Sequence, residues 1–152
     1  MSRNGPDEDE RGCVMTSPSA HGTGPDGGAE PEPRLLCDAR ALADAPPLPA
    51  GVLWKLDEPG RQLDANVVRL APGTSVAPHR EPDLDVLLFV VAGGGVLGAG
   101  RDDEPRQLAP GATVWLPHGS TRSLTAGREG LTCLTVHRRR PGMRIRRRDE
   151  AT

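Results

Sequence analysis

The sequence predicts an all-β protein built as one small antiparallel barrel or sandwich. Its apolar segments are short and rich in β-forming residues. Turn dipeptides and a glycine cluster separate them at intervals of roughly 8 to 12 residues, a pattern typical of antiparallel barrels and sandwiches. No part of the sequence alternates strands with helices as an α/β protein does. The chain has 152 residues, which is enough for a single domain and its tails.

The first segment of the chain is predicted to be disordered. Residues 1–33 show almost no apolar periodicity, are dominated by Gly, Pro, Ser, Asp and Glu, and include an acidic run at residues 7–10. A segment of this composition cannot bury enough apolar surface to offset the entropy lost on ordering. We therefore expect an acidic tail over residues 1–33 and a folded barrel over residues 34–137.

The last segment, residues 138–152, is predicted to be a second tail. It contains seven arginines, which would allow contacts with phosphates. It has no aromatic residue of the kind that stacks on nucleic-acid bases. The whole chain contains a single lysine, Lys55, so arginine is its general basic residue. An arginine cluster is therefore weaker support for nucleic-acid binding than it is in other chains. Nucleic acid is therefore not expected as a partner.

Turn residues define the first part of the barrel. Residues 34–44 contain three leucines and predict a short initial strand followed by a turn or brief helix, before a proline-rich break. Apolar and polar residues alternate over 52–56, which predicts a strand. Another strand is predicted over residues 64–70, because apolar residues there precede the turn dipeptide Pro72-Gly73.

The most apolar segment lies at the centre of the predicted barrel. Residues 84–92 are rich in β-forming residues and too short between turns for a helix, so they predict a central strand. The three glycines at 93–95 supply the positive φ that a tight hairpin needs, and residues 96–100 are predicted to return as the partner strand. After a second Pro-Gly turn, three more strands are predicted, at residues 112–116, 122–125 and 131–137.

The chain carries no sign of export or of a membrane span. Its three cysteines are odd in number and widely spaced, so a disulfide framework is not expected. No apolar run approaches the ~18 residues of a membrane helix. The first residues are acidic and polar, whereas a secretory signal has a basic start and an apolar stretch. We predict a cytoplasmic protein without a membrane partner.

Two segments each contain turn residues and glycines at characteristic spacings. The first runs from Pro72-Gly73 through His79 to the glycines at 93–95, and the second is Gly111-x5-Pro117-x-Gly119. In this order and spacing they resemble the two motifs of the cupin superfamily, in the form found in small single-domain cupins. The resemblance implies an antiparallel double-stranded β-helix, or jelly-roll barrel, over residues 34–137.

Metal-binding cupins hold one cation with two histidines and a glutamate from the first motif and a histidine from the second. The resemblance places His79 at the first histidine position and Glu81 at the second. Val86 takes the glutamate position, with Asp85 beside it. Arg122 replaces the histidine of the second motif. The motifs therefore keep their turns and lose most of their metal ligands.

These departures change the chemistry of the predicted site. A guanidinium has no lone pair to donate and carries a permanent positive charge, so Arg122 repels a divalent cation. Asp85 lies one residue away from the glutamate position, and a shift of one residue turns a side chain to the other face of a strand unless a bulge intervenes. The candidate metal ligands are then His79, Glu81 and Asp85, for iron, manganese, zinc or nickel. The departures favour a barrel without any cofactor.

The same residues predict a ligand pocket without metal. If Glu81 and Arg122 face each other across the barrel, they form an ion pair, and Arg122 also offers donors to a carboxylate or phosphate. We predict that His79, Glu81 and Arg122 bind a small polar or anionic ligand. The alternative is a metal-dependent enzyme of the dioxygenase, isomerase or decarboxylase type. The sequence identifies no catalytic residue, and it leaves a homodimer through exposed strand edges open.

Several other side chains have simpler interpretations. His118 is predicted to be an exposed turn residue and His137 a surface residue. Cys133 is predicted to be a small buried apolar residue, because no histidine adjacent in sequence activates it. The aromatic residues are predicted to lie in the core: Trp54, Phe89 and Trp115.

Overall fold

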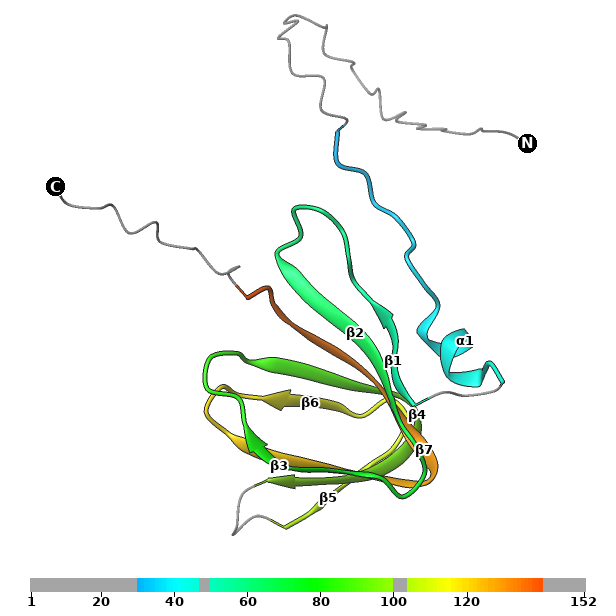
Figure 1. Cartoon of the computed structure of the whole chain (residues 1–152), viewed down its shortest axis with the longest axis vertical. Helices are drawn as coiled ribbons and strands as arrows, with labels where there is room; N and C mark the ends of the chain where they lie inside the picture. Colours follow the sequence, from blue (N-terminus) through cyan, green and yellow to red (C-terminus); the bar gives the residue numbers. More distant parts are fainter. Residues whose placement is uncertain (1–29, 47–49, 100–103, 141–152) are drawn as a thin grey trace, which may run out of the picture. The chain divides into compact units, whose positions relative to one another are not determined.

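Antiparallel strands follow one another from residue 51 to residue 138 in the computed structural model of the chain (Figure 1). The structure describes residues 30–46, 50–99 and 104–140, so most of the two predicted tails lies outside the described residues. The chain divides into two units, Met1–Arg34 and Leu35–Thr152, and the second contains every element described. These are α1 (Ala39–Asp44), β1 (Gly51–Lys55), β2 (Leu63–Leu70), β3 (Ser75–Arg80), β4 (Val86–Ala99), β5 (Arg106–Leu108), β6 (Thr113–Leu116) and β7 (Thr121–Arg138).

Two long strands organise the barrel. β4 and β7 pair antiparallel from Leu87 opposite Val136 to Ala99 opposite Arg122. The first half of β4 and the second half of β7 are flanked by β6 on one side and by β2 and β1 on the other. The second half of β4 and the first half of β7 are flanked by β5 and β3. Each long strand therefore contributes to both layers of a jelly roll, and the predicted all-β class is confirmed.

Glycines allow β4 to pass from one layer to the other. Gly93 has a φ of +70°, and a Cβ there would lie 2.1 Å from the carbonyl oxygen of Gly130. A Cβ at Gly95 would lie 2.2 Å from the carbonyl oxygen of Thr125. The two long strands thus approach each other more closely than a side chain permits. The predicted hairpin at residues 93–95 is wrong, because β4 continues through these glycines and then pairs with β5.

Strands that end at Pro-Gly turns or follow regular alternation were predicted well. The strands expected at residues 52–56, 64–70 and 112–116 agree with β1, β2 and β6 to within one residue at each end. The strands expected at residues 122–125 and 131–137 are two parts of the single strand β7. Residues 126–130 were expected to separate them, because glycine is as common in turns as in strand bends.

Two strands were missed in the sequence. β3 contains Pro78, and its pairing with β7 shifts register between Val76 and His79. Proline cannot donate a hydrogen bond to a sheet, so it argues against a strand unless the strand lies at an edge or carries a bulge. β5 is only three residues long and gives no pattern to recognise.

The interior of the barrel is apolar and comes from one face of each strand. Along β4, Leu88 and Val90 are buried, whereas Leu87 and Phe89, which alternate with them, are exposed. This alternation follows from the two-residue period of a strand. Cys133 is buried as predicted, and burial raises the pKa of its thiol to about 12. The core cluster contains Leu88, Val90, Leu97, Leu108, Leu116, Ala126, Leu131 and Cys133.

Two of the three aromatic residues do not lie in the core. Trp115 is 66% exposed and lies opposite Leu87, which places both on the outer face of the sheet. Phe89 is two residues along β4 from Leu87 and faces the same way. Trp54 is half-buried. The prediction of core positions for Phe89 and Trp115 is wrong, because the position of a residue in the two-residue period of its strand, and not its size, decides whether it faces the core.

The single described helix is short. Asp38 caps α1 by accepting hydrogen bonds from the backbone N–H groups of Arg40 and Ala41, at 2.9 and 3.0 Å. It contacts β4, and Ala43 is its buried residue. No helix within the described residues has the length and apolarity that crossing a membrane requires.

Candidate functional site

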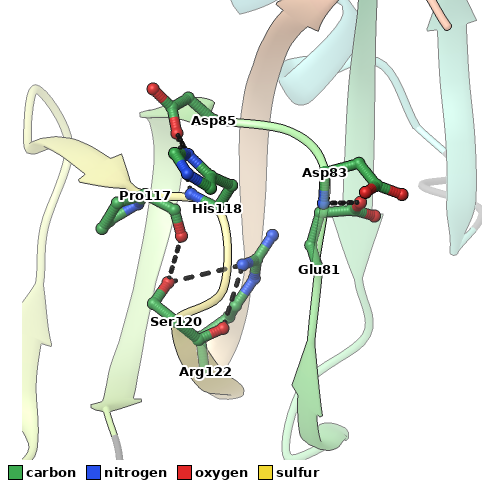
Figure 2. A network of polar contacts seen from close by, with 7 residues as sticks. All are labelled: Glu81, Asp83, Asp85, Pro117, His118, Ser120 and Arg122. Atoms are coloured by element: carbon green, nitrogen blue, oxygen red, sulfur yellow. Dashed lines mark hydrogen bonds and ion pairs between the residues drawn. The ribbon is translucent and has the colours of Figure 1, made fainter.

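The ends of the long strands meet at one end of the barrel, which we call the mouth. β4 and β7 each bend in the middle. The segment where Leu87 pairs with Val136 therefore lies at the same end of the barrel as the segment where Ala99 pairs with Arg122. Hydrogen bonds join the loops there: the backbone N–H of Gly119 donates to the carbonyl of Glu81 at 2.6 Å. The mouth comprises residues 79–86, 117–122 and 137–140, and Figure 2 shows part of it.

Arg122 is the buried charge of the mouth. It lies on β7 between His79 of β3 and Ala99 of β4, and only 5% of its surface is exposed. Its guanidinium donates from Nη1 to the carbonyl oxygen of Ser120 at 3.2 Å and lies 3.5 Å from the Ser120 hydroxyl (Figure 2). Among the described residues, no carboxylate lies within ion-pair distance of it. Arg122 is therefore a cation held in the barrel by neutral oxygens.

Glu81 does not pair with Arg122 as predicted. Its carboxylate forms an ion pair with Arg140 and accepts a hydrogen bond from the backbone N–H of Asp83 at 3.2 Å. In Figure 2 its dashed contact runs to Asp83, with none to the guanidinium of Arg122. The expected pairing across the barrel is thus replaced by a contact with the segment that follows β7.

His79 lies directly opposite Arg122 in the β3–β7 pair. Opposed residues on neighbouring strands place their side chains on the same face of the sheet. The imidazole is nevertheless exposed, and its Nδ1 lies 3.0 Å from the carbonyl oxygen of Ala77. His79 therefore lies at the edge of the mouth, next to Arg122 in register.

The candidate metal ligands do not come together. Among the described residues, no three side chains of the His, Cys, Asp and Glu types gather in a way that would hold an ion. Glu81 is paired with Arg140, and Asp85 is bonded to His118. The donor set of His79, Glu81 and Asp85 therefore does not fit a metal centre, and Arg122 adds a positive charge next to it.

Asp85 and His118 form a pair that the sequence did not reveal. One carboxylate oxygen of Asp85 accepts the backbone N–H of His118 at 2.8 Å and lies 2.7 Å from the imidazole Nδ1 (Figure 2). The backbone hydrogen bond, followed by the one from the imidazole, lowers the pKa of Asp85. His118 is exposed as predicted. These residues are 33 positions apart, and only the turn motif hinted that their segments meet.

A hollow of about 480 Å³ opens beside this pair, lined by Asp83, Asp85, His118 and Arg138. The turn at Pro117–Ser120 joins it to Arg122. The Ser120 hydroxyl donates to the carbonyl of Pro117 at 2.6 Å, and Arg122 donates to Ser120. His118 thus belongs to this turn, and Arg122, the second residue of β7, is hydrogen-bonded to the end of it.

Polar residues also line the inner faces of β2 and β7. Asn66 lies opposite Thr135, on the face that carries Val68 and Cys133 two residues along each strand. His137, two residues further along β7, is partly exposed, which agrees with the surface position predicted for it. Counting by twos from the buried Cys133 would have identified this face from the sequence.

Comparisons with known proteins give structural likenesses alone. No family model matches the sequence, and no curated protein matches it. KdgF from Halomonas sp. is 21% identical, with a TM-score of 0.51 over 59% of this chain and 78% of that chain. BH2720 from Bacillus halodurans is 18% identical, with a TM-score of 0.57 over 76% of this chain and 87% of the other.

A third similar structure is a cupin domain. The cupin domain of Cnp3 from Schizosaccharomyces pombe is 14% identical, with a TM-score of 0.50 over 57% of this chain and 59% of that chain. At such identities these likenesses speak to the fold of the barrel and to nothing else. They do not carry a ligand or an activity over to this chain.

Proposed function

Because this chain has the cupin fold, we propose that its barrel binds a small anionic ligand, with a carboxylate as the group recognised, and that Arg122 is the anchor. The fold by itself does not select a ligand, since one scaffold hosts unrelated functions. The proposal therefore depends on the site, and one observation carries it. Arg122 is buried and, among the described residues, faces no carboxylate.

The energetic reason is the cost of burying a charge. A cation removed from water is destabilising unless an opposite charge or several hydrogen bonds compensate it. Ser120 supplies two neutral oxygens, one of them at 3.5 Å, which is too long for a good hydrogen bond. An anionic ligand would supply the missing charge.

The geometry of the guanidinium also supports a carboxylate. An arginine side chain has five N–H donors in a planar fork that matches the two oxygens of a carboxylate. The hydrogen bonds that Arg122 makes to described residues both leave from Nη1. Donors on Nε and Nη2 remain for a ligand. A phosphate offers the same recognition chemistry, so the test includes it.

The described residues do not favour the metal-dependent enzyme that the sequence left as an alternative. Its ligand set is not assembled, because Glu81 and Asp85 each have another partner. Arg122 occupies the position of the remaining histidine and has no lone pair. We therefore propose a ligand site built around a cation of the protein.

The test is calorimetric titration of the full chain with acetate, malonate and phosphate, with neutral acetamide as the uncharged comparison. We expect the anions to bind and acetamide not to bind. Arg122→Met should weaken binding at least about tenfold, the value of a charge-assisted hydrogen bond. The matched control is Arg128→Met, because Arg128 is exposed and lines a different hollow, with Gly93 and Gly127.

Equal binding by wild type and Arg122→Met would disprove the assignment. Anion binding that is lost in Arg128→Met instead would move the site to the other end of the barrel. Failure of all three anions to bind wild type would overturn the proposed function.

A further inference from the structure

We propose that the outer face of the sheet is an interface to a second copy of this chain, and that Trp115 of each copy packs into a hollow on the other. The inference is independent of the proposed ligand site, because the residues that carry it lie on the outside of the barrel, whereas Arg122 is held inside. The sequence left open a homodimer through strand edges. The surface proposed here is a face and not an edge.

The outer face is apolar across five neighbouring strands, in the order β6, β4, β7, β2 and β1. Residues opposite each other in paired strands share a face, so the register identifies its members. Of the nine central positions, only that of Thr113 is polar. The nine are Thr113 and Trp115 of β6, Leu87 and Phe89 of β4, Leu134 and Val136 of β7, Ala65 and Val67 of β2, and Trp54 of β1.

Such a face needs a cover. An antiparallel sheet commonly packs one face on the core and presents a polar face to water, but here the other face carries the core cluster as well. The chain covers its outer face only in part: Val67 is fully buried, and α1 contacts β4. At the β6 side, Trp115 is 66%, Leu87 47% and Phe89 38% exposed. Contiguous exposed apolar side chains of this size mark an interaction surface.

A hollow of about 630 Å³ lies beside these exposed side chains. Phe89 and Leu134 of the outer face line one side of it, and Leu35, Cys37 and the first turn of α1 line the other. Leu35 is itself 94% exposed, so the rim of the hollow adds a large apolar side chain in contact with water. One face of the molecule therefore carries an exposed indole and an apolar hollow next to each other.

An exposed side chain and a hollow on one face complement each other when two copies are related by a twofold axis. In such an interface, residue i contacts residue j of the other copy, and residue j contacts residue i. An axis in the plane of contact, midway between Trp115 and the hollow, places each indole opposite the hollow of the partner subunit. Both hollows and both indoles are then covered by the same contact. The face therefore fits a copy of itself.

The charged groups around the face are compatible with this arrangement. Asp38 and Arg40 line the hollow near α1, and Asp85 and Arg138 line the hollow at the mouth, toward the other end of the face. Each end thus carries one acid and one base, so two copies meet without a net repulsion of like charges. Asp85 lies beside Trp115, and the twofold axis brings it toward Arg40 of the partner subunit.

The area of the face is that of a weak dimer. Five strands about 4.8 Å apart make it roughly 24 Å wide, and about six residues at ~3.3 Å each make it roughly 20 Å long. Its area is then on the order of 500 Å², whereas a stable complex covers about 800 Å² of accessible surface on each partner. Leu35 and α1 add to the face. We therefore expect a dimer that dissociates in the micromolar range.

Sedimentation of the full chain from about 1 to about 200 μM tests the proposal, because a dimer forms by mass action. We expect the mass to rise from 16.1 kDa toward twice that value. Trp115→Glu should raise the dimer Kd at least about thirtyfold, as for loss of a central aromatic contact. The matched control is Val52→Glu, because Val52 is 63% exposed but lies opposite Val68, on the other face of the sheet.

A second variant tests the hollow. Ala39 lines it, so the phenyl ring of Ala39→Phe should occupy the space that the indole of the partner subunit needs. The dimer Kd should rise at least about tenfold. Arg122→Met should dimerise as wild type does, since Arg122 is buried inside the barrel. Circular dichroism at low concentration should show the same spectrum for all these variants, because none of them removes a contact across the outer face of a single copy.

The outcomes decide between this interface and others. A chain that stays monomeric at every concentration would overturn the proposal and leave the outer face to a different partner. A dimer that Trp115→Glu leaves intact, or that Val52→Glu weakens equally, would place the interface elsewhere, for example at a strand edge. If Trp115→Glu disrupts the dimer and Ala39→Phe does not, the packing of Trp115 into the hollow is disproved.

Discussion

Asp85 and His118 lie 33 residues apart in the sequence, and one oxygen of the Asp85 carboxylate accepts hydrogen bonds from both the backbone and the imidazole of His118. This contact ties the loop before β4 to the turn after β6. It shapes the hollow at the mouth and determines the tautomer of the imidazole. The position of the β3–β4 loop and the proton on Nδ1 of His118 therefore both depend on the Asp85 carboxylate.

The first prediction concerns acid. The hydrogen bonds from His118 hold the pKa of Asp85 below its usual value of about 3.9. A carboxylate whose pKa is lower in the folded state stabilises the protein above its unfolded-state pKa, and this contribution is lost as the pH falls through the folded-state pKa. Wild type should therefore melt at a higher temperature than Asp85→Asn at neutral pH, and the difference should shrink below about pH 4.

Thermal unfolding followed by circular dichroism across this pH range measures the effect. Asp83→Asn is the control, because the side chain of Asp83 accepts no hydrogen bond from a described residue. If the difference in melting temperature between wild type and Asp85→Asn stayed constant into the acid range, it would contradict the assigned hydrogen bonds.

The second prediction concerns the bend of β4. Gly93→Ala should lower the free energy of unfolding by about 3 kcal/mol or more, because its Cβ meets the Gly130 carbonyl at a positive φ. Gly73 has a nearly equal φ, +72°, but a Cβ there meets nothing within 4 Å. Gly73→Ala should therefore cost only about 1 kcal/mol, from strain alone. Urea denaturation measures the free energy of unfolding of both variants. Equal decreases in the two variants would show that β4 and β7 do not approach each other as described.

The third prediction concerns an unpaired hydroxyl. Thr132 is buried, and its Oγ1 has no hydrogen-bond partner among the residues that the structure describes. Thr132→Val keeps the shape and removes the unpaired group, so it should raise the free energy of unfolding by about 1 kcal/mol. Thr125 is exposed and its hydroxyl lies 3.0 Å from that of Ser75. Thr125→Val should therefore stay within about 0.5 kcal/mol of wild type. Destabilisation by Thr132→Val would reveal a partner for the hydroxyl.

The fourth prediction concerns the thiol of Cys133. Burial raises its pKa to about 12, so almost none of it is thiolate at neutral pH. Iodoacetamide should leave Cys133 unmodified in the folded protein and react with it after unfolding in urea. Cys37 is only partly buried, so it should react first. Mass spectrometry of digested protein locates the label, and rapid labelling of Cys133 under native conditions would contradict its burial.

The fifth prediction concerns the effect of the buried Arg122 on the free energy of unfolding. Replacing a buried, uncompensated charge by an apolar side chain of similar length is often neutral or stabilising. Arg122→Met should therefore unfold at the same urea concentration as wild type or at a higher one when no anion is present. Malonate at a hundred times the wild-type Kd should stabilise wild type by about 2.7 kcal/mol, and Arg122→Met by at least about 1 kcal/mol less. A strongly destabilised Arg122→Met would instead mark Arg122 as a structural residue.

Local patterns in the chain predict the fold class and the positions of several strands. Alternation and Pro-Gly turns are local signals, and they located β1, β2 and β6. The resemblance of the second turn motif to that of the cupins placed Arg122 where metal-binding cupins have a histidine. A guanidinium repels a cation wherever it lies, so its consequence for metal binding needed no coordinates.

The roles of the glycines and of the charged residues depend instead on contacts between segments that are far apart in the sequence. The glycines at 93–95 suit a hairpin and a bend equally well, and the approach of Gly130 and Thr125 from β7 selects the bend. The partners of Glu81 and Asp85 come from residues 59 and 33 positions away. No local pattern encodes such pairs, because folding brings their loops together at the mouth. The proposed anion anchor, Arg122, could therefore be identified from the sequence, whereas its surroundings depend on contacts between distant segments.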